Sequence, residues 1–69
     1  MHPVKTVHVN GRKQETAAGN VAALIAELGF VPNTVLVEHN ATALRPGEWS
    51  ACPIADGDRI ELLRLAAGG

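Results

Sequence analysis

The chain has few of the residues on which many protein chemistries depend. A single cysteine, Cys52, excludes an internal disulfide, and one cysteine with three scattered histidines forms no zinc-ligand pattern. Phe30 and Trp49 are the only aromatic residues, so a platform for stacking nucleic-acid bases is not expected. The six basic residues are dispersed in a chain of net charge −1. This composition predicts no nucleic-acid partner.

Long apolar runs and catalytic motifs are also missing. No apolar stretch approaches the roughly 18 residues of a membrane span, and residues 1–10 alternate in polarity, unlike a signal peptide. No nucleophile–base pair, phosphate-binding loop or metal cluster is evident. Cys52 is predicted to be a small buried apolar residue, and the histidines show no ligand spacing and no paired nucleophile. We therefore expect a soluble, cytoplasmic protein with no membrane partner that is not an enzyme.

What is present indicates one small folded domain. Apolar residues make up 46% of the 69 residues and charged residues 19%, a balance typical of a globule with one core. Asn10-Gly11 lies between alternating segments and predicts a β-hairpin over residues 4–15. Asn20 can cap a helix whose apolar residues recur at helical spacing, and Gly29 can end it. That apolar set is Val21, Leu24, Ile25 and Leu28.

The second half of the chain reads mainly as strands. Residues 34–40 are β-branched and alternating, residues 43–44 form a possible short strand, and residues 59–65 form the last strand. Residues 45–49 are predicted as loop or a short helical turn, and residues 56–58 as a tight turn. One short helix must cover a sheet, so we expect an α+β domain with a mixed four- to five-stranded sheet. The first and last strands should lie side by side, with the last strand in the interior.

The last strand has two different faces. Ile60 and Leu62 point to one side, and Glu61, Leu63 and Leu65 point to the other. If the helix covers the first side, the second leaves exposed aliphatic side chains that could dock a partner. Scattered surface residues, or burial in a homodimer, are the alternatives.

Four small residues follow Leu65: Ala66, Ala67, Gly68 and Gly69. We predict a domain over residues 1–65 and a flexible tail over residues 66–69, with Ala66 and Ala67 contributing to partner binding. Glycine lets a backbone enter a narrow channel, and four extended residues reach roughly 14 Å. A terminal carboxylate is ionised at neutral pH and must be activated, for example as an acyl-AMP, before sulfur or an amine can capture it. Alternatively, the diglycine belongs to an ordinary frayed tail.

Taken together, the chain resembles the ThiS family of sulfur carriers, within the ThiS/MoaD ubiquitin-like β-grasp superfamily. The resemblance covers nearly the whole chain and rests on "VHVNG", "VAALIAELG", "VLVEHN", "LRPGEW", "DGDRIELL" and the final "GG". It implies a β-grasp fold with one main helix on one sheet face and an extended C-terminal tail. Two departures are Asn40-Ala41, where Asn-Gly is usual, and Ala66-Ala67, where bulkier aliphatics are common. The first questions the turn geometry and the second the fit to the activating enzyme.

The resemblance also implies a function. An E1-like adenylyltransferase of the ThiF type would adenylate Gly69, and a sulfur donor such as a cysteine desulfurase would convert it to a thiocarboxylate. The sulfur would then pass to thiazole synthase of the ThiG type. ATP and Mg²⁺ would belong to the activating enzyme, with no cofactor bound by the carrier itself. Only Gly68 and Gly69 match the family's functional residues position for position.

Two other functions remain open at this point. The chain could carry sulfur for a different product, such as molybdopterin, cysteine or a specialised metabolite. MoaD-type chains are usually longer and begin with a different, Phe-bearing helix, so they match less well. The chain could instead be a ubiquitin-like binding module whose tail is never activated.

Overall fold

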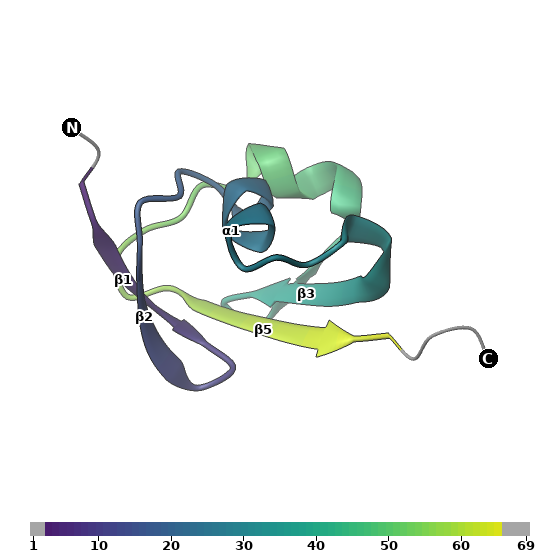
Figure 1. Cartoon of the computed structure of the whole chain (residues 1–69), viewed down its shortest axis with the longest axis horizontal. Coiled ribbons are helices and arrows are strands. Elements are labelled where there is room, and N and C mark those ends of the chain that lie inside the picture. Colours follow the sequence, from purple (N-terminus) through teal and green to yellow (C-terminus); the bar gives the residue numbers. More distant parts are fainter. Residues whose placement is uncertain (1–2, 66–69) are drawn as a thin grey trace.

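Five strands form one mixed sheet in the order β2-β1-β5-β3-β4 (Figure 1). The structure is a computed structural model that describes residues 3–65. β1 and β5 pair in parallel, whereas the other neighbours pair antiparallel, so the last strand lies between the first and the third. The predicted mixed sheet, including its interior last strand, is confirmed. The strands are β1 (Lys5–Val9), β2 (Arg12–Thr16), β3 (Val35–His39), β4 (Thr42–Leu44) and β5 (Arg59–Arg64).

One α-helix, α1 (Val21–Glu27), crosses a single face of this sheet (Figure 1). Asn20 caps it as predicted, because its Oδ1 accepts a hydrogen bond from the Ala23 N–H at 2.8 Å. The short 3-10 helix η1 (Pro32–Thr34) precedes β3, and a longer one, η2 (Pro46–Ala51), packs beside α1 on the same side. None of the helices within residues 3–65 is long and apolar enough to cross a membrane.

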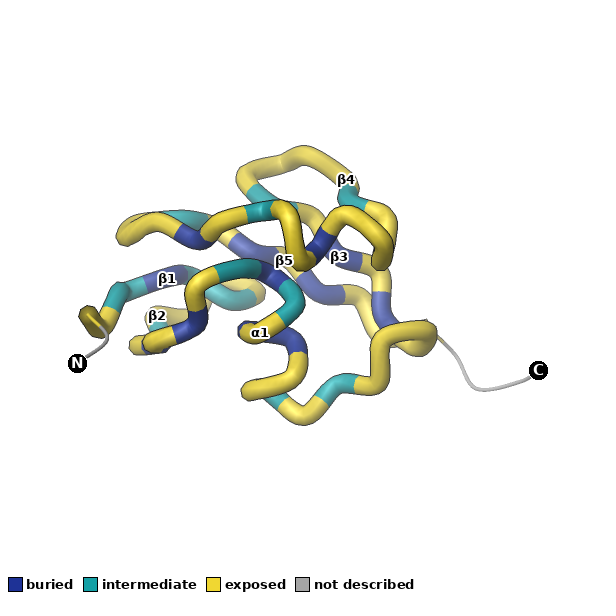
Figure 2. Tube along the Cα trace, turned by 90° about the horizontal axis from the view of Figure 1, so that it is seen from above, coloured by how far each residue is buried: buried dark blue, intermediate teal, exposed yellow. Residues whose placement is uncertain are grey.

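The core lies between the sheet and the layer formed by α1 and η2. Figure 2 shows buried positions alternating with exposed ones along the strands, as expected when one face of a sheet is covered. Burial of each large aliphatic side chain contributes about 1.5–3 kcal/mol, so this single layer supplies most of the stabilisation. The buried apolar residues are Val7, Ala18, Val21, Leu24, Ile25, Val35, Val37, Trp49, Ile54, Ile60 and Leu62.

Two asparagine side chains attach the hairpin turns to the central strand. Asn10 Oδ1 accepts from the Leu62 N–H at 2.7 Å, and Asn10 Nδ2 donates to the Leu62 carbonyl at 3.1 Å. At the other turn, Asn40 Oδ1 accepts from the Arg59 N–H at 2.8 Å. Both asparagines have positive φ, 50° and 49°, as a two-residue hairpin turn requires. β5 is therefore held from both sides by turns as well as by strands.

The β3–β4 turn keeps its geometry without glycine. Ala41 adopts φ 70°, so Asn40-Ala41 forms the same left-handed pair that Asn-Gly forms elsewhere. An L-residue with a Cβ pays about 1–2 kcal/mol in this region of backbone space. The turn is thus retained at a cost in stability.

Ala41→Gly is expected to raise the free energy of unfolding by about 1 kcal/mol, because it removes the Cβ from a left-handed position. Urea denaturation followed by circular dichroism measures the change. Ala43→Gly is the control, since Ala43 lies in β4, where glycine should be destabilising by about 0.5–1 kcal/mol. A loss of stability in Ala41→Gly would contradict the strain at this turn.

Candidate functional site

The face of the sheet turned away from α1 carries exposed aliphatic side chains. Within residues 3–65 no helix or strand covers it (Figure 1). Leu36 of β3 and Leu63 of β5 are directly opposite each other and are 53% and 63% exposed. Leu65 continues the same side of β5 and is 42% exposed. The alternation along β5 predicted this position for Leu63 and Leu65.

Two carboxylates border the leucines. Glu38 of β3 and Glu61 of β5 are also direct partners in the register, and both are exposed. A hollow of about 340 Å³ lies over this part of the sheet. We call the surface formed by Leu36, Glu38, Glu61, Leu63 and Leu65 the open face.

The open face leads directly to the segment predicted to be functional. Leu65 N–H donates to the Thr34 carbonyl at 2.8 Å, so pairing with the β3 side continues one residue beyond β5. Ala66, Ala67, Gly68 and Gly69, the predicted tail and thiocarboxylate site, lie outside the described residues. The last described residue before that segment is therefore itself part of the open face.

A second cluster lies at the opposite end of β5, where Cys52, His39 and Asp58 meet. His39 Nε2 is 2.6 Å from Asp58 Oδ2, and His39 Nδ1 is 3.4 Å from Cys52 Sγ. A neutral His39 that donates from Nε2 and accepts the thiol proton at Nδ1 satisfies both contacts. The expectation that no histidine is paired with a nucleophile was wrong. Residues distant in sequence meet here because the β3 end, η2 and the turn before β5 converge.

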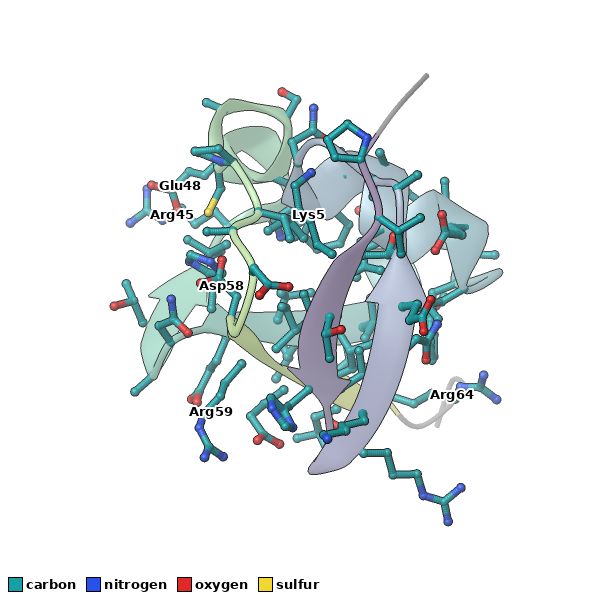
Figure 3. All side chains as sticks on the ribbon, turned by 90° about the vertical axis from the view of Figure 1, so that its left-hand side faces the viewer. Lys5, Arg45, Glu48, Asp58, Arg59 and Arg64 are labelled. Carbon is teal, nitrogen blue, oxygen red and sulfur yellow. The ribbon has the colours of Figure 1, made fainter. Side chains whose placement is uncertain are left out.

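The surroundings keep Asp58 ionised and Cys52 protonated. Burial favours a raised pKa for Asp58, but hydrogen bonds from the Ala55 N–H, His39 and Asn40 outweigh it and hold the pKa below its ordinary value. For the Cys52 thiol, burial raises the pKa, and the carboxylates of Asp58 and Glu48 raise it further. Figure 3 shows Glu48 and Asp58 on the same side of the molecule.

This arrangement is suited to holding the fold together rather than to nucleophilic chemistry. A thiol with a raised pKa is poorly ionised at neutral pH and is a weak nucleophile. Cys52 is half-buried and packs against the core, so it is less enclosed than the sequence predicted. Asp58 precedes β5 and Leu65 follows it, a separation of roughly 20 Å along an extended strand.

Sequence reasoning missed two residues of the open face, Leu36 and Glu38, whereas the alternation along the last strand already placed Glu61 on the side of Leu63 and Leu65. The alternation of residues 35–39 placed Leu36 and Glu38 on one side of a strand. Which residues of β5 lie opposite them depends on register, which no local pattern specifies. No group of side chains within residues 3–65 is arranged to hold a metal ion.

Asp58→Asn is expected to lower the free energy of unfolding at neutral pH and to make this free energy depend less on pH under acid conditions. Because the folded pKa of Asp58 is depressed, its contribution is complete above the ordinary value near 3.8 and is lost as pH falls through the folded pKa. Urea unfolding between pH 7 and pH 2 measures this. Asp56→Asn is the control in the same turn, and equal pH dependence in wild type and Asp58→Asn would contradict the assignment.

Comparison with known proteins places the chain in a family. The model of the ThiS family matches residues 7–69. A crystal structure of the thiamine biosynthesis protein ThiS from Geobacter metallireducens is similar, with a TM-score of 0.77 and 29% identity over 93% of this chain and 99% of that one. A thiazole synthase from Magnetococcus marinus is 33% identical over 64 residues, which are 91% of this chain. The chain spans about a fifth of that relative's length (20%). With the β-grasp sheet and helix described above, these matches show that the chain belongs to the ThiS family.

Proposed function

We propose that the protein is a sulfur carrier of thiamine biosynthesis. The observation that carries the proposal is the position of β5. It is a central strand that contributes to the open face, and in the sequence it is followed by Leu65 and then by Ala66-Ala67-Gly68-Gly69. The family match, which extends over these last residues, supports the same reading. The domain anchors the tail and offers a surface for partners, while the partners perform the chemistry.

Gly69 is the residue that changes chemically. Its carboxylate attacks the α-phosphorus of ATP on an E1-like adenylyltransferase, pyrophosphate leaves, and an acyl-AMP forms. The outer sulfur of a persulfide, supplied by a donor such as a cysteine desulfurase, then attacks the carbonyl carbon, AMP leaves, and an acyl disulfide forms. A thiol reductant cleaves its S–S bond and is itself oxidised to a disulfide, so that Gly69 ends in a thiocarboxylate. ATP and Mg²⁺ are held by the adenylyltransferase in this scheme, and Gly68 leaves the backbone slim enough to enter its site.

The thiocarboxylate then donates its sulfur to thiazole synthase. The similarity of this chain to about a fifth of a longer chain named thiazole synthase supports this partner. The open face supplies the docking surface, since exposed leucines beside a reactive chain end bring that end to a partner's active site. The carrier itself catalyses no step.

The first test is the intact mass of the protein after co-expression with its adenylyltransferase and a sulfur donor. We expect one oxygen atom to be replaced by sulfur, with the modification confined to Gly69 in the fragment spectrum. A variant with one alanine added after Gly69 is the control and should stay unmodified, because its carboxylate is displaced from the activating site.

An unmodified mass of the wild-type protein under these conditions, together with no consumption of ATP by the adenylyltransferase, would contradict the carrier function. Retained partner binding in the extended variant, without any modification of wild type, would favour the binding module. A modified wild type whose sulfur is not used by thiazole synthase would favour a carrier for another product.

Leu63→Asp is expected to weaken binding of thiazole synthase about tenfold or more, because a charge is inserted into an apolar contact. Isothermal titration calorimetry measures the affinity, and circular dichroism should show an unchanged fold. Val31→Asp is the matched control, since Val31 is equally exposed, at 63%, but lies before η1 and outside the open face. Unfolding of Leu63→Asp would show that this side chain stabilises the core.

A further inference from the structure

The open face contains two like charges in direct opposition. Glu38 and Glu61 are register partners. The Asn40 N–H donates to the Arg59 carbonyl, and the Leu65 N–H donates to the Thr34 carbonyl. Because backbone-bonded and non-bonded positions alternate along an antiparallel ladder, the backbones of Glu38 and Glu61 form a bonded position, where the two Cα atoms are about 5.5 Å apart. Like charges directly opposite on one face of a sheet are destabilising. The free protein therefore carries an unfavourable pair at an exposed position.

Within residues 3–65, neither glutamate side chain forms a salt bridge or a hydrogen bond. The one salt bridge in that part of the chain joins His39 and Asp58. Arg59 precedes Glu61 by two residues on the same face, but its side chain extends away from the body of the domain (Figure 3). Arg64 lies on the opposite side of β5, with its guanidinium 5.1 Å from the centre of the Phe30 ring.

The two carboxylates also have apolar neighbours. Leu36 and Leu63 form the next pair along the same strands, and the hollow of about 340 Å³ is lined by both leucines and both glutamates. When a basic side chain enters such a hollow, its charged group loses water and contacts two carboxylates instead, while its aliphatic part contacts leucine. The surface is thus complementary to a basic side chain that projects from an apolar patch.

We propose that Glu38 and Glu61 together bind one arginine side chain of thiazole synthase, whose neighbouring apolar residues contact Leu36 and Leu63. This inference rests on the proposed function, which assigns that enzyme to the open face. Arginine fits better than lysine, because its planar guanidinium has five donors and can bridge two carboxylates, and it is more weakly hydrated. Binding of this cation relieves the repulsion between the glutamates, which provides specificity for a basic partner.

The test compares the double variant Glu38→Gln/Glu61→Gln with wild type in binding to thiazole synthase. We expect the dissociation constant to rise about tenfold or more, since a desolvated charge pair is lost. The wild-type affinity should fall as salt increases, and the variant should lose most of this dependence. Urea unfolding of the free variant should show equal or higher stability, because the repulsion is removed. Glu15→Gln is the matched control, an exposed glutamate on the distant strand β2, and should change neither affinity nor stability.

Unchanged affinity or unchanged salt dependence in the double variant would overturn the inference. A loss of binding to the adenylyltransferase, with binding to thiazole synthase intact, would also overturn it by assigning the pair to another occupant. The thiocarboxylate mass of the double variant separates this failure from failure of the proposed function. If wild type and variant are both converted to the thiocarboxylate, the carrier function stands whatever the glutamates do.

Discussion

The placement of β5 between β1 and β3 is the constraint on which the rest of the molecule depends. β5 pairs in parallel with the first strand and antiparallel with the third, and the side chains of Asn10 and Asn40 hydrogen-bond to its backbone. The strand that leads to the chain's last residues is therefore held by neighbouring strands on both of its edges. A domain built in this way can present a short terminal segment to another protein while its own fold stays anchored.

A short chain with one α-helix can bury only one face of its sheet. α1 and η2 cover the side that contains Ile60 and Leu62, and the other side keeps Leu36 and Leu63 in contact with solvent. Such exposure brings a risk of association in the free protein. Under the proposed function, the same exposure provides the docking surface, and the proposed role of the glutamate pair beside the leucines is to restrict which partners fit.

The two ends of β5 have different physical characters. At its beginning, Asp58 joins His39 and Cys52 in a network that ties three segments together and keeps the thiol protonated. At its other end, Leu65 still pairs with Thr34 and precedes the four residues that the proposed function assigns to a partner enzyme's active site. Under the proposed function, the reactive sulfur of this protein is one that it receives at Gly69, and its own cysteine serves the fold.

The sequence by itself determined the features that depend on neighbouring residues. The Asn10-Gly11 turn, the Asn20 cap and the two-sided alternation of residues 60–65 were predicted correctly, because backbone φ preferences, capping and strand periodicity act locally. Tertiary structure alone decided which side chains meet across strands and layers. Glu38 faces Glu61, and His39 reaches Cys52, only because strand register and the packing of η2 bring distant segments together, and neither is encoded in any short stretch of residues.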